Sequence, residues 1–463
     1  MSAIDQAAGA RPGGTAGWRE LWLKEDWWAI WLGLGIVAAA YLAFVGGGSL
    51  SWIAVTPAKW STLDQLAAHF AGNLGRYVAQ FAVWAIIFSV ALTALGFKAR
   101  EFVPAFVFVY LVSTLIFALG QWDQAAKYNL EPPLVALVLG LLISNVFGLP
   151  RWLDAGFRVE FYIKTGIVLL GATLPFTLIV WAGPVAIFQA SIVSIVTFFV
   201  IFWVSRALGL DRRLAAVLGA GGAVCGVSAA IAIAGAVGAK KEHAPIAITV
   251  VVMWAIVMIF FLPFASQALH LPAGVAGAWI GTSEFADAAG FAAAQTYGAM
   301  AGQNGIAGTA DQAIWAFTLM KVVGRDVWIG IWAFVLAIVA VTQWERTGPT
   351  RTPDVAEIWW RFPKFVIGFL IASLFVTWVA SAYSLADYNK TVVPALVAPI
   401  KDLRTWTFIF CFFSIGLTTR FRELASAGRT PFVAFSVGVA VNVALGFFLS
   451  AVVFAAHWQN LVH

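Results

Sequence analysis

The sequence predicts an all-α polytopic membrane protein, and three features of its composition support this class. Of the 463 residues, 62% are hydrophobic and only 11% are charged, and the mean hydropathy is +0.89. A soluble globular protein has about 45–50% apolar and about 25% charged residues. The chain therefore has too few charged side chains to cover a soluble core, which excludes soluble enzymes and disordered proteins.

Thirteen stretches are apolar enough to cross a bilayer, for which a helix needs about 20 residues. The more polar segment 49–76 fits either a helix lying in the membrane interface or a loop outside it. The predicted spans lie near residues 27–45, 77–97, 102–120, 132–149, 162–182, 184–205, 214–239, 245–268, 273–298, 312–342, 362–383, 394–417 and 431–455.

The order of the spans predicts four regions. Residues 1–26 are polar and form a cytoplasmic N-terminal segment, and residues 27–130 hold about three extra N-terminal helices. The remaining ten spans divide into a first five-helix repeat over 131–270 and a second over 271–463. An odd number of spans makes the two repeats insert with opposite orientation, and such inverted repeats are typical of secondary transporters.

Matching features in the two groups of five support the repeat. The second span of the first group contains Lys164-Thr165-Gly166, and that of the second contains Lys321-Val322-Val323-Gly324. The fourth spans contain small and hydroxyl residues over 219–228 and 414–419. We interpret these two segments as breaks in the helices. Unwound backbone at membrane depth requires a cavity or a ligand, so both breaks are candidate binding segments. Close packing of small residues between helices is the alternative interpretation.

Two carboxylates interrupt an apolar span at Glu284 and Asp287. They are three residues apart and share a face of a helix. An ionisable residue inside the membrane is by default a functional candidate, so we assign both to coupling with H⁺ or Na⁺. The alternative is that the span starts later and that both carboxylates lie at the membrane interface.

Lys321 and Arg325 are four residues apart in the span 312–342, so they also share a face. They suit an oxyanion, or alternatively a structural ion network with neighbouring acids such as Asp326. The predicted substrate site consists of Gly222, Cys225, Gly226, Ser228, Thr282, Ser283, Ser414, Gly416, Thr418, Thr419, Lys321 and Arg325.

Other chemistry finds little support in the sequence. The two cysteines, Cys225 and Cys411, lie in separate apolar stretches, and the five histidines are scattered. This pattern argues against zinc sites and a disulfide framework, and no GxxxxGK[ST] motif indicates ATP use. We expect no catalytic residues, no metal and no cofactor. The net charge of +6 fits basic cytoplasmic loops and not nucleic-acid binding.

From about residue 130 onward, the chain resembles the sulfate exporter family of bacterial inner-membrane proteins (the YeiH type). The resemblance lies in the segments 164–171, 219–230, 279–283 and 414–419. This family is similar to the superfamily of bile-acid symporters and cation/proton antiporters. The resemblance implies two inverted five-helix repeats with a crossed pair of broken helices, one from the fourth span of each repeat. Residues 27–130 carry more spans than the single leading helix expected in the family.

The expected function is a secondary active transporter that exports sulfate or a related small oxyanion, such as an organosulfonate, by alternating access. A cation/proton antiporter that uses Glu284 and Asp287, and a passive anion channel, are the alternatives. The expected partners are the small anionic substrate, the lipid bilayer and further copies of the chain, without nucleic acid. We expect a multi-pass protein of the bacterial inner membrane in which the crossed region moves against the other helices, as in an elevator.

With a cytoplasmic N-terminus, most of the 28 Lys and Arg residues fall in cytoplasmic segments, as the positive-inside rule requires. Thirteen spans then place the C-terminus outside. A topology reporter fused after His463 should therefore report the periplasmic side, whereas the same reporter in the loop near Arg212 should report the cytoplasm. A cytoplasmic signal from the C-terminal fusion would contradict the odd number of spans.

Overall fold

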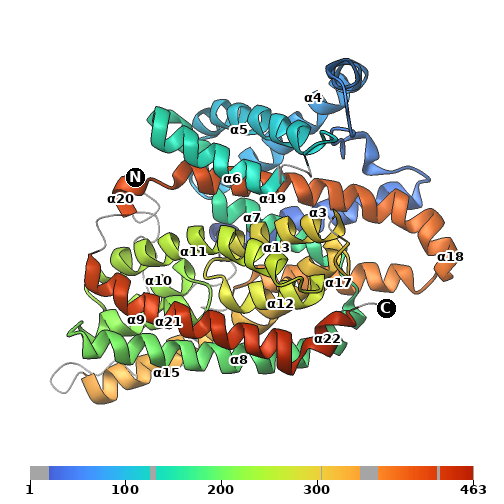
Figure 1. Cartoon of the computed structure of the whole chain (residues 1–463). Coiled ribbons are helices and arrows are strands. Elements are labelled where there is room, and N and C mark those ends of the chain that lie inside the picture. Colours follow the sequence, from blue (N-terminus) through green and yellow to red (C-terminus); the bar gives the residue numbers. More distant parts are fainter. Residues whose placement is uncertain (1–19, 126–131, 304, 345–362, 425–427, 462–463) are drawn as a thin grey trace. The chain divides into compact units, whose positions relative to one another are not determined.

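The computed structural model describes residues 20–125, 132–303, 305–344, 363–424 and 428–461, and these residues form an all-helical protein (Figure 1). Residues 1–19 of the predicted N-terminal segment lie outside the described part. Residues 20–26 of that segment contain α2 (Glu20–Leu23) and the start of α3. No β-strand occurs among the described residues. The predicted all-α class is therefore confirmed.

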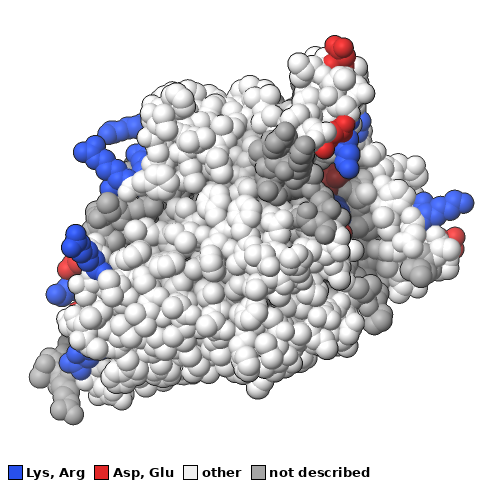
Figure 2. All heavy atoms as spheres, in the orientation of Figure 1, with Lys and Arg blue, Asp and Glu red and all other residues white. Residues whose placement is uncertain are grey.

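Seven helices in the described part are long and apolar enough to cross a membrane, so the protein is a polytopic membrane protein. Uncharged residues make up most of the face shown in Figure 2, where Lys, Arg, Asp and Glu lie at the margins. The long helices are α3 (Glu25–Val45), α4 (Leu63–Ala94), α5 (Ala99–Gly120), α8 (Phe176–Ala207), α11 (His243–Ala268), Ala310–Trp344 and Arg429–Val453. Shorter apolar helices cover Pro132–Phe147, Val227–Ala236 and Phe365–Ala380.

Every predicted span coincides with helix in the structure, but several boundaries differ. The span predicted at 162–182 contains the end of one helix at Gly171 and the start of α8 after Pro175. The second half of segment 49–76 belongs to α4, whose start Thr62 caps by accepting a hydrogen bond from the N–H of Gln65. Hydropathy marks apolar length, whereas turns and caps set where each helix begins and ends.

The chain divides into two compact units, and each combines segments that are distant in the sequence. Unit 1 comprises the described residues within 181–363 and 421–463, and unit 2 those within 16–180 and 364–420. Helices on both sides of the predicted repeat boundary at 270/271 thus belong to the same unit. Packing therefore groups the helices differently from their order along the chain.

Unit 2 is built around α19, which packs against α6 and α7. Gly140 of α6 and Gly416 of α19 allow close approach, because a Cβ atom at Gly416 would lie 2.8 Å from Cα of Gly140 and 2.5 Å from the carbonyl oxygen of Leu137. Ser144 donates a hydrogen bond to the carbonyl oxygen of Gly416 (3.0 Å). Besides α2 to α5, the elements of this unit are η1 (Leu50–Trp52), α6 (Pro132–Leu142), η3 (Ile143–Phe147), η4 (Arg151–Gly156), α7 (Val159–Gly171), α17 (Phe365–Ala380), α18 (Leu385–Asp387), η7 (Tyr388–Val397) and α19 (Ala398–Thr418).

The predicted break at Ser414–Thr419 is wrong, because α19 is one continuous helix from Ala398 to Thr418. The hydroxyl groups bond within the helix: Thr418 Oγ1 donates to the carbonyl oxygen of Ser414 (2.8 Å), and Thr419 Oγ1 donates to that of Ile415 (2.7 Å). Gly416 serves the close contact with α6. Small residues at this position therefore have the packing role that is common between membrane helices.

Unit 1 contains a pair of long helices joined by buried polar groups. Asn442 Nδ2 donates to Thr197 Oγ1 (2.9 Å), and Gln189 Nε2 donates to Ser450 Oγ (2.7 Å). These bonds align α8 with α21 and η9, which lie side by side in Figure 1. With α8 from residue 181 onward and α11, the elements are α9 (Arg212–Ala223), α10 (Val227–Ala236), α12 (Ala273–Ser283), α13 (Asp287–Gln303), α14 (Ala310–Thr318), η5 (Leu319–Arg325), α15 (Trp328–Val339), η6 (Ala340–Trp344), α20 (Phe421–Leu424), α21 (Arg429–Phe448), η9 (Leu449–Val453) and α22 (Ala455–Gln459).

The close contact between α6 and α19 gives a direct test. Substituting Gly416→Ala should destabilise the protein by about 1–3 kcal/mol, because the added methyl group meets backbone atoms that cannot rotate away. The melting temperature of the purified protein in detergent measures the effect. Gly75→Ala in α4 is the matched control, since its Cβ would meet nothing within 4 Å. Equal melting temperatures for the two variants would show that α6 and α19 are not closely packed.

Candidate functional site

Two helices of unit 1 are interrupted in the middle of apolar sequence. The first break, Val224–Gly226, separates α9 from α10, and the second break, Glu284–Ala286, separates α12 from α13. Each break leaves carbonyl groups at the end of one half-helix and N–H groups at the start of the next without helical partners. In a membrane such groups must find partners inside the protein, so the surroundings of the two breaks indicate what they do.

The two breaks lie against each other. Gly226 has a φ of +71°, which glycine adopts without strain and which other residues rarely adopt. A Cβ atom at Gly226 would also overlap the carbonyl oxygen of Phe285 and lie 2.6 Å from Cγ1 of Val251. Glycine is therefore required here for both its conformation and its size. We call this contact between the breaks Val224–Gly226 and Glu284–Ala286 the crossing. It brings together two backbone segments that are distant in the sequence.

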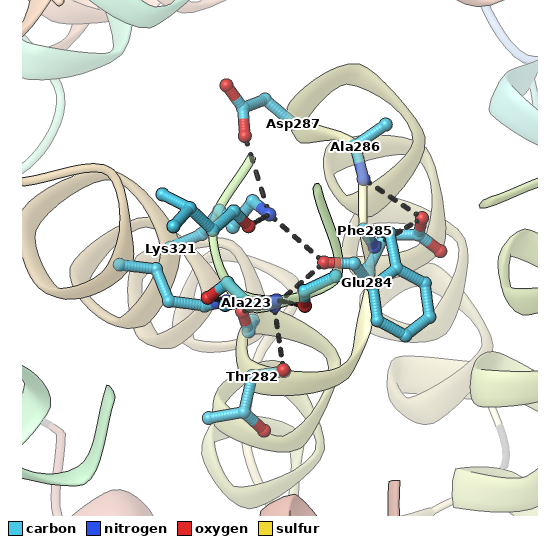
Figure 3. A network of polar contacts seen from close by, with 11 residues as sticks. Ala223, Thr282, Glu284, Phe285, Ala286, Asp287 and Lys321 are labelled. Carbon is cyan, nitrogen blue, oxygen red and sulfur yellow. Dashed lines mark hydrogen bonds and ion pairs between the residues drawn. The ribbon is translucent and has the colours of Figure 1, made fainter. Parts of the chain in front are cut away.

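Lys321 joins the two breaks from a third segment. Its side chain is completely buried, and Nζ donates to the carbonyl oxygens of Val224 (2.8 Å) and Glu284 (3.0 Å), one from each break (Figure 3). The residue lies in η5, a π-helical segment marked by the hydrogen bond from the N–H of Asp326 to the carbonyl oxygen of Lys321 (3.0 Å). Such π-helical segments are frequent at functional sites.

Arg325 serves the ends of the same two half-helices. Its Nε and Nη2 donate to the carbonyl oxygens of Ala223 (3.1 Å) and Gly222 (2.7 Å) at the end of α9. Nη1 donates to those of Thr282 (2.7 Å) and Glu284 (2.9 Å) at the end of α12. The C-terminal end of a helix carries partial negative charge. Lys321 and Arg325 therefore neutralise two such ends at one point.

Acidic side chains complete the crossing. Glu284 is fully buried, and its Oε1 accepts hydrogen bonds from the N–H groups of Phe285 (2.8 Å) and Ala286 (3.3 Å). Among the described residues, Oε2 of Glu284 has no hydrogen-bond partner. Asp287 Oδ1 lies 3.6 Å from Lys321 Nζ, and its side chain is 17% exposed, whereas that of Lys321 is 0% exposed. Asp287 is therefore on the more accessible side of the ion pair.

The N-termini of the two following half-helices differ. The carboxylate of Glu284 accepts two backbone N–H groups immediately before α13. At the start of α10, Gly226 has no side chain to cap the helix, and Ser228 in the first turn is exposed. A helix N-terminus attracts anions through its free N–H groups and its dipole. At the start of α10, the N–H of Ala229 instead contacts the buried side chain of Cys225, and Ser228 provides an exposed hydroxyl group.

The structure places most of the predicted site residues in unit 1, and the others belong to unit 2. The crossing contains Gly222, Cys225, Gly226, Ser228, Thr282, Ser283, Glu284, Asp287, Lys321 and Arg325. Ser414, Gly416, Thr418 and Thr419 belong to unit 2, and the crossing in unit 1 is made without them. Within the described part, no three His, Cys, Asp or Glu side chains are grouped so that they could hold a metal ion.

The residue types alone do not identify the second broken helix. The polar run Thr282-Ser283-Glu284 in an apolar span was the available signal, but its carboxylates suggested ion coupling and not a break. The carbonyl groups of Gly222, Ala223 and Val224 could not be found at all, because backbone ligands leave no mark in the residue types. Lys321 and Arg325 mainly contact backbone carbonyls, with Asp287 beside Lys321, and neither sequence interpretation named these carbonyl partners.

These contacts predict a large loss of stability for Arg325→Gln. The substitution leaves carbonyl groups of α9 and α12 unpaired in a buried site, and each such group costs about 1–3 kcal/mol. The melting temperature in detergent should fall well below that of wild type. Arg213→Gln is the control, because Nη1 of Arg213 also donates to a carbonyl oxygen, that of Gly238 (2.6 Å), at an exposed position. An Arg325→Gln protein as stable as the control would contradict the capping role.

Comparison with known proteins places the chain in a family. The profile of the family described as conserved hypothetical protein 698 matches residues 104–435. A UPF0324 membrane protein of Rhodopirellula baltica is 34% identical over 88% of this chain and 72% of its own length. One of Nitrosomonas europaea is 28% identical over 88% of this chain and 90% of its own. One of Nitratidesulfovibrio vulgaris is 33% identical over 80% of this chain, which spans 62% of that relative. No solved structure matches the chain. The chain therefore belongs to the conserved hypothetical protein 698 family, whose relatives here are UPF0324 membrane proteins.

Proposed function

We propose that the protein is a secondary active transporter that exports a small oxyanion by alternating access. The observation that carries this proposal is the crossing of two broken helices, whose carbonyl ends are held by Lys321 and Arg325. Discontinuous helices are costly in a membrane and are used by many transporters to bind substrates near the middle of the bilayer.

The start of α10 is the proposed substrate contact. The N–H groups around Gly226 and the hydroxyl of Ser228 are hydrogen-bond donors, and the buried ammonium of Lys321 adds positive charge close by. A divalent oxyanion needs many donors and some positive charge. In this proposal Arg325 is a positioning residue, because its Nε, Nη1 and Nη2 atoms all donate to backbone carbonyls.

Sulfate and organosulfonates are the proposed substrates because the chain resembles the sulfate exporter family in four segments, of which 219–230 and 279–283 contribute to the crossing. Location in the bacterial inner membrane, a cytoplasmic N-terminus and a homo-oligomeric state belong to the same proposal. So does an elevator-like movement of the crossed region during transport.

Cation/proton antiport is the second candidate, and the carboxylates favour it. Oε2 of Glu284 has no hydrogen-bond partner among the described residues although the side chain is buried. Asp287 lies beside Lys321 with part of its surface accessible. A carboxylate pair can exchange H⁺ or Na⁺ without any anion. This candidate uses the same crossing but assigns the cargo to Glu284 and Asp287.

Uptake into proteoliposomes decides between the candidates. The purified protein is reconstituted and supplied with sulfate, methanesulfonate or chloride, with pH and Na⁺ gradients imposed separately. We expect sulfate or methanesulfonate to accumulate above its external concentration under one gradient, with protein-free vesicles as the control. Proton flux that depends on Na⁺ but not on any anion would establish the antiporter instead. Anion flux that never exceeds equilibrium would indicate a channel.

A further inference from the structure

The two ends of the α9–α10 pair lie side by side. Arg213, in the first turn of α9, donates from Nη1 to the carbonyl oxygen of Gly238 just after α10 (2.6 Å). Nδ1 of His243 lies 3.9 Å from Oδ1 of Asp211, the N-cap residue of α9. A straight helix from Arg213 to Gly238 would separate these two residues by about 38 Å, because each residue adds about 1.5 Å. The chain therefore turns back at the break Val224–Gly226, and α10 returns toward the start of α9.

The α12–α13 pair turns back in the same way. The N–H of Ala273, the first residue of α12, donates to the carbonyl oxygen of Ala307, shortly after α13 ends (2.9 Å). A Cβ atom at Gly308 would lie 2.8 Å from Cβ of Ala273. The few residues that follow α13 are too short to cross back over the length of both helices. The chain therefore reverses at Glu284–Ala286, and both pairs are helical hairpins.

The helix α11 connects the two hairpins and places their open ends on opposite sides of the membrane. It has 26 residues, so it is about 39 Å long and can cross a hydrocarbon core about 30 Å thick. The open end of α9–α10 carries Arg212, Arg213, Lys240 and Lys241, whereas residues 242–320 contain neither Lys nor Arg. By the positive-inside rule, the basic open end of α9–α10 is cytoplasmic and that of α12–α13 is outside.

This arrangement changes the predicted topology. The spans predicted at 214–239 and 273–298 then each enter and leave the membrane on one side. The predicted number of crossings falls by two and stays odd. A full crossing at 214–239 would have placed Lys240 and Lys241 outside, whereas a hairpin keeps both in the cytoplasm. The positive-inside rule is therefore obeyed better than with thirteen crossings.

One arm of these hairpins, α10, is packed less firmly than the others. Three of its ten residues are buried, whereas all eleven residues of α12 are. The end of α9 is held by hydrogen bonds from Arg325 to the carbonyl oxygens of Gly222 and Ala223. Each end of α10 is followed or preceded by a glycine with a positive φ, Gly226 at +71° and Gly238 at +58°. Hinges lie at such element ends, where a few residues absorb the change in dihedral angles. Movement of α10 against a fixed α9 is therefore the motion that this hairpin permits.

We propose that α9–α10 and α12–α13 are re-entrant hairpins that enter the membrane from the cytoplasm and from outside, and that α10 is the gate between the crossing and the cytoplasm. The topology holds whatever the protein carries, whereas the gate rests on the proposed transport. The tips of the hairpins meet where Gly226 faces the carbonyl oxygen of Phe285. The arms of α9–α10 therefore lie between the crossing and the cytoplasm. Movement of α10 about Gly226 and Gly238 opens this path, and the exported anion enters through it.

Single introduced cysteines test the topology in the full-length protein. Arg212→Cys, Lys241→Cys, Ala268→Cys and Ala307→Cys all lie at exposed positions. Right-side-out and inside-out membrane vesicles are treated with a membrane-impermeant maleimide. We expect the first two variants to react only in inside-out vesicles and the last two only in right-side-out vesicles. The wild-type chain, whose two cysteines are buried, measures the background.

The sides from which the cysteines react decide the topology. Reaction of Lys241→Cys from the side opposite to Arg212→Cys would show that 214–239 crosses the membrane, and it would overturn the first hairpin. Opposite sides for Ala268→Cys and Ala307→Cys would overturn the second. Matching sides with the reverse orientation would overturn the assignment of α9–α10 to the cytoplasm. Lys240→Cys and Ala310→Cys replace any variant that does not fold, because both positions are also exposed.

A disulfide between the arms of α9–α10 tests the gate. A Cβ atom at Gly221 would lie 3.9 Å from Cβ of Ala230, which is within the range of about 3.5–4.5 Å that a disulfide requires. Oxidation of the Gly221→Cys/Ala230→Cys protein should lock α10 onto α9 and abolish sulfate or methanesulfonate uptake into proteoliposomes. A reducing agent should restore the uptake. The two single variants, treated with the same oxidant, are the matched controls and should keep their uptake.

The outcomes separate the gate from the proposed function. Full uptake by the oxidised pair, with the disulfide confirmed by loss of free thiols, would overturn the gate and leave oxyanion transport in place. A pair that forms no disulfide would contradict the packing of α10 against α9. If wild type transports neither anion, the proposed function and the gate fall together, and the maleimide labelling still decides whether the hairpins are re-entrant.

Discussion

Hydrogen bonds from Lys321 and Arg325 to the carbonyl oxygens of two half-helices make the crossing possible. Lys321 Nζ contacts Val224 and Glu284, and Arg325 contacts the ends of the same two half-helices. Unpaired carbonyl groups in a membrane cost several kcal/mol each, so the breaks and the two cations depend on each other. Both cations are fully buried, and their hydrogen bonds go to backbone carbonyl oxygens.

The need to pair these carbonyl groups gives Lys321 and Arg325 different roles, although the sequence placed both in the anion site. A guanidinium whose Nε, Nη1 and Nη2 atoms all donate to backbone carbonyls holds structure, and its charge reaches a ligand only through the electric field. Lys321 differs, because its third neighbour is the partly accessible carboxylate of Asp287 and not a carbonyl group. In the proposed function, contact with the anion therefore belongs to Lys321 and the start of α10.

Glycine and serine occur both around the first break, over residues 219–228, and in α19, with different results. Gly226 has a positive φ and touches the carbonyl oxygen of Phe285, which makes it part of an unwound segment. Gly416 lies within a continuous helix and lets α6 approach. Both segments combine glycine with a hydroxyl residue. Nearby cations distinguish them, because only the first segment has carbonyl ends held by Lys321 and Arg325.

The sequence by itself determined the membrane class, the apolar segments that become helices, and Glu284, Lys321 and Arg325 as candidate charges inside the membrane. Apolar length and the cost of burying charge are properties of local sequence, so they can be read without a structure. Tertiary structure alone decided that α12–α13 is the second broken helix, that α19 is continuous and that Arg325 caps helix ends. These features depend on backbone dihedral angles and on contacts such as that of Lys321 with Val224, which are 97 positions apart in the chain. Carbonyl groups are present in every residue, and only the folded chain shows which of them need a cation.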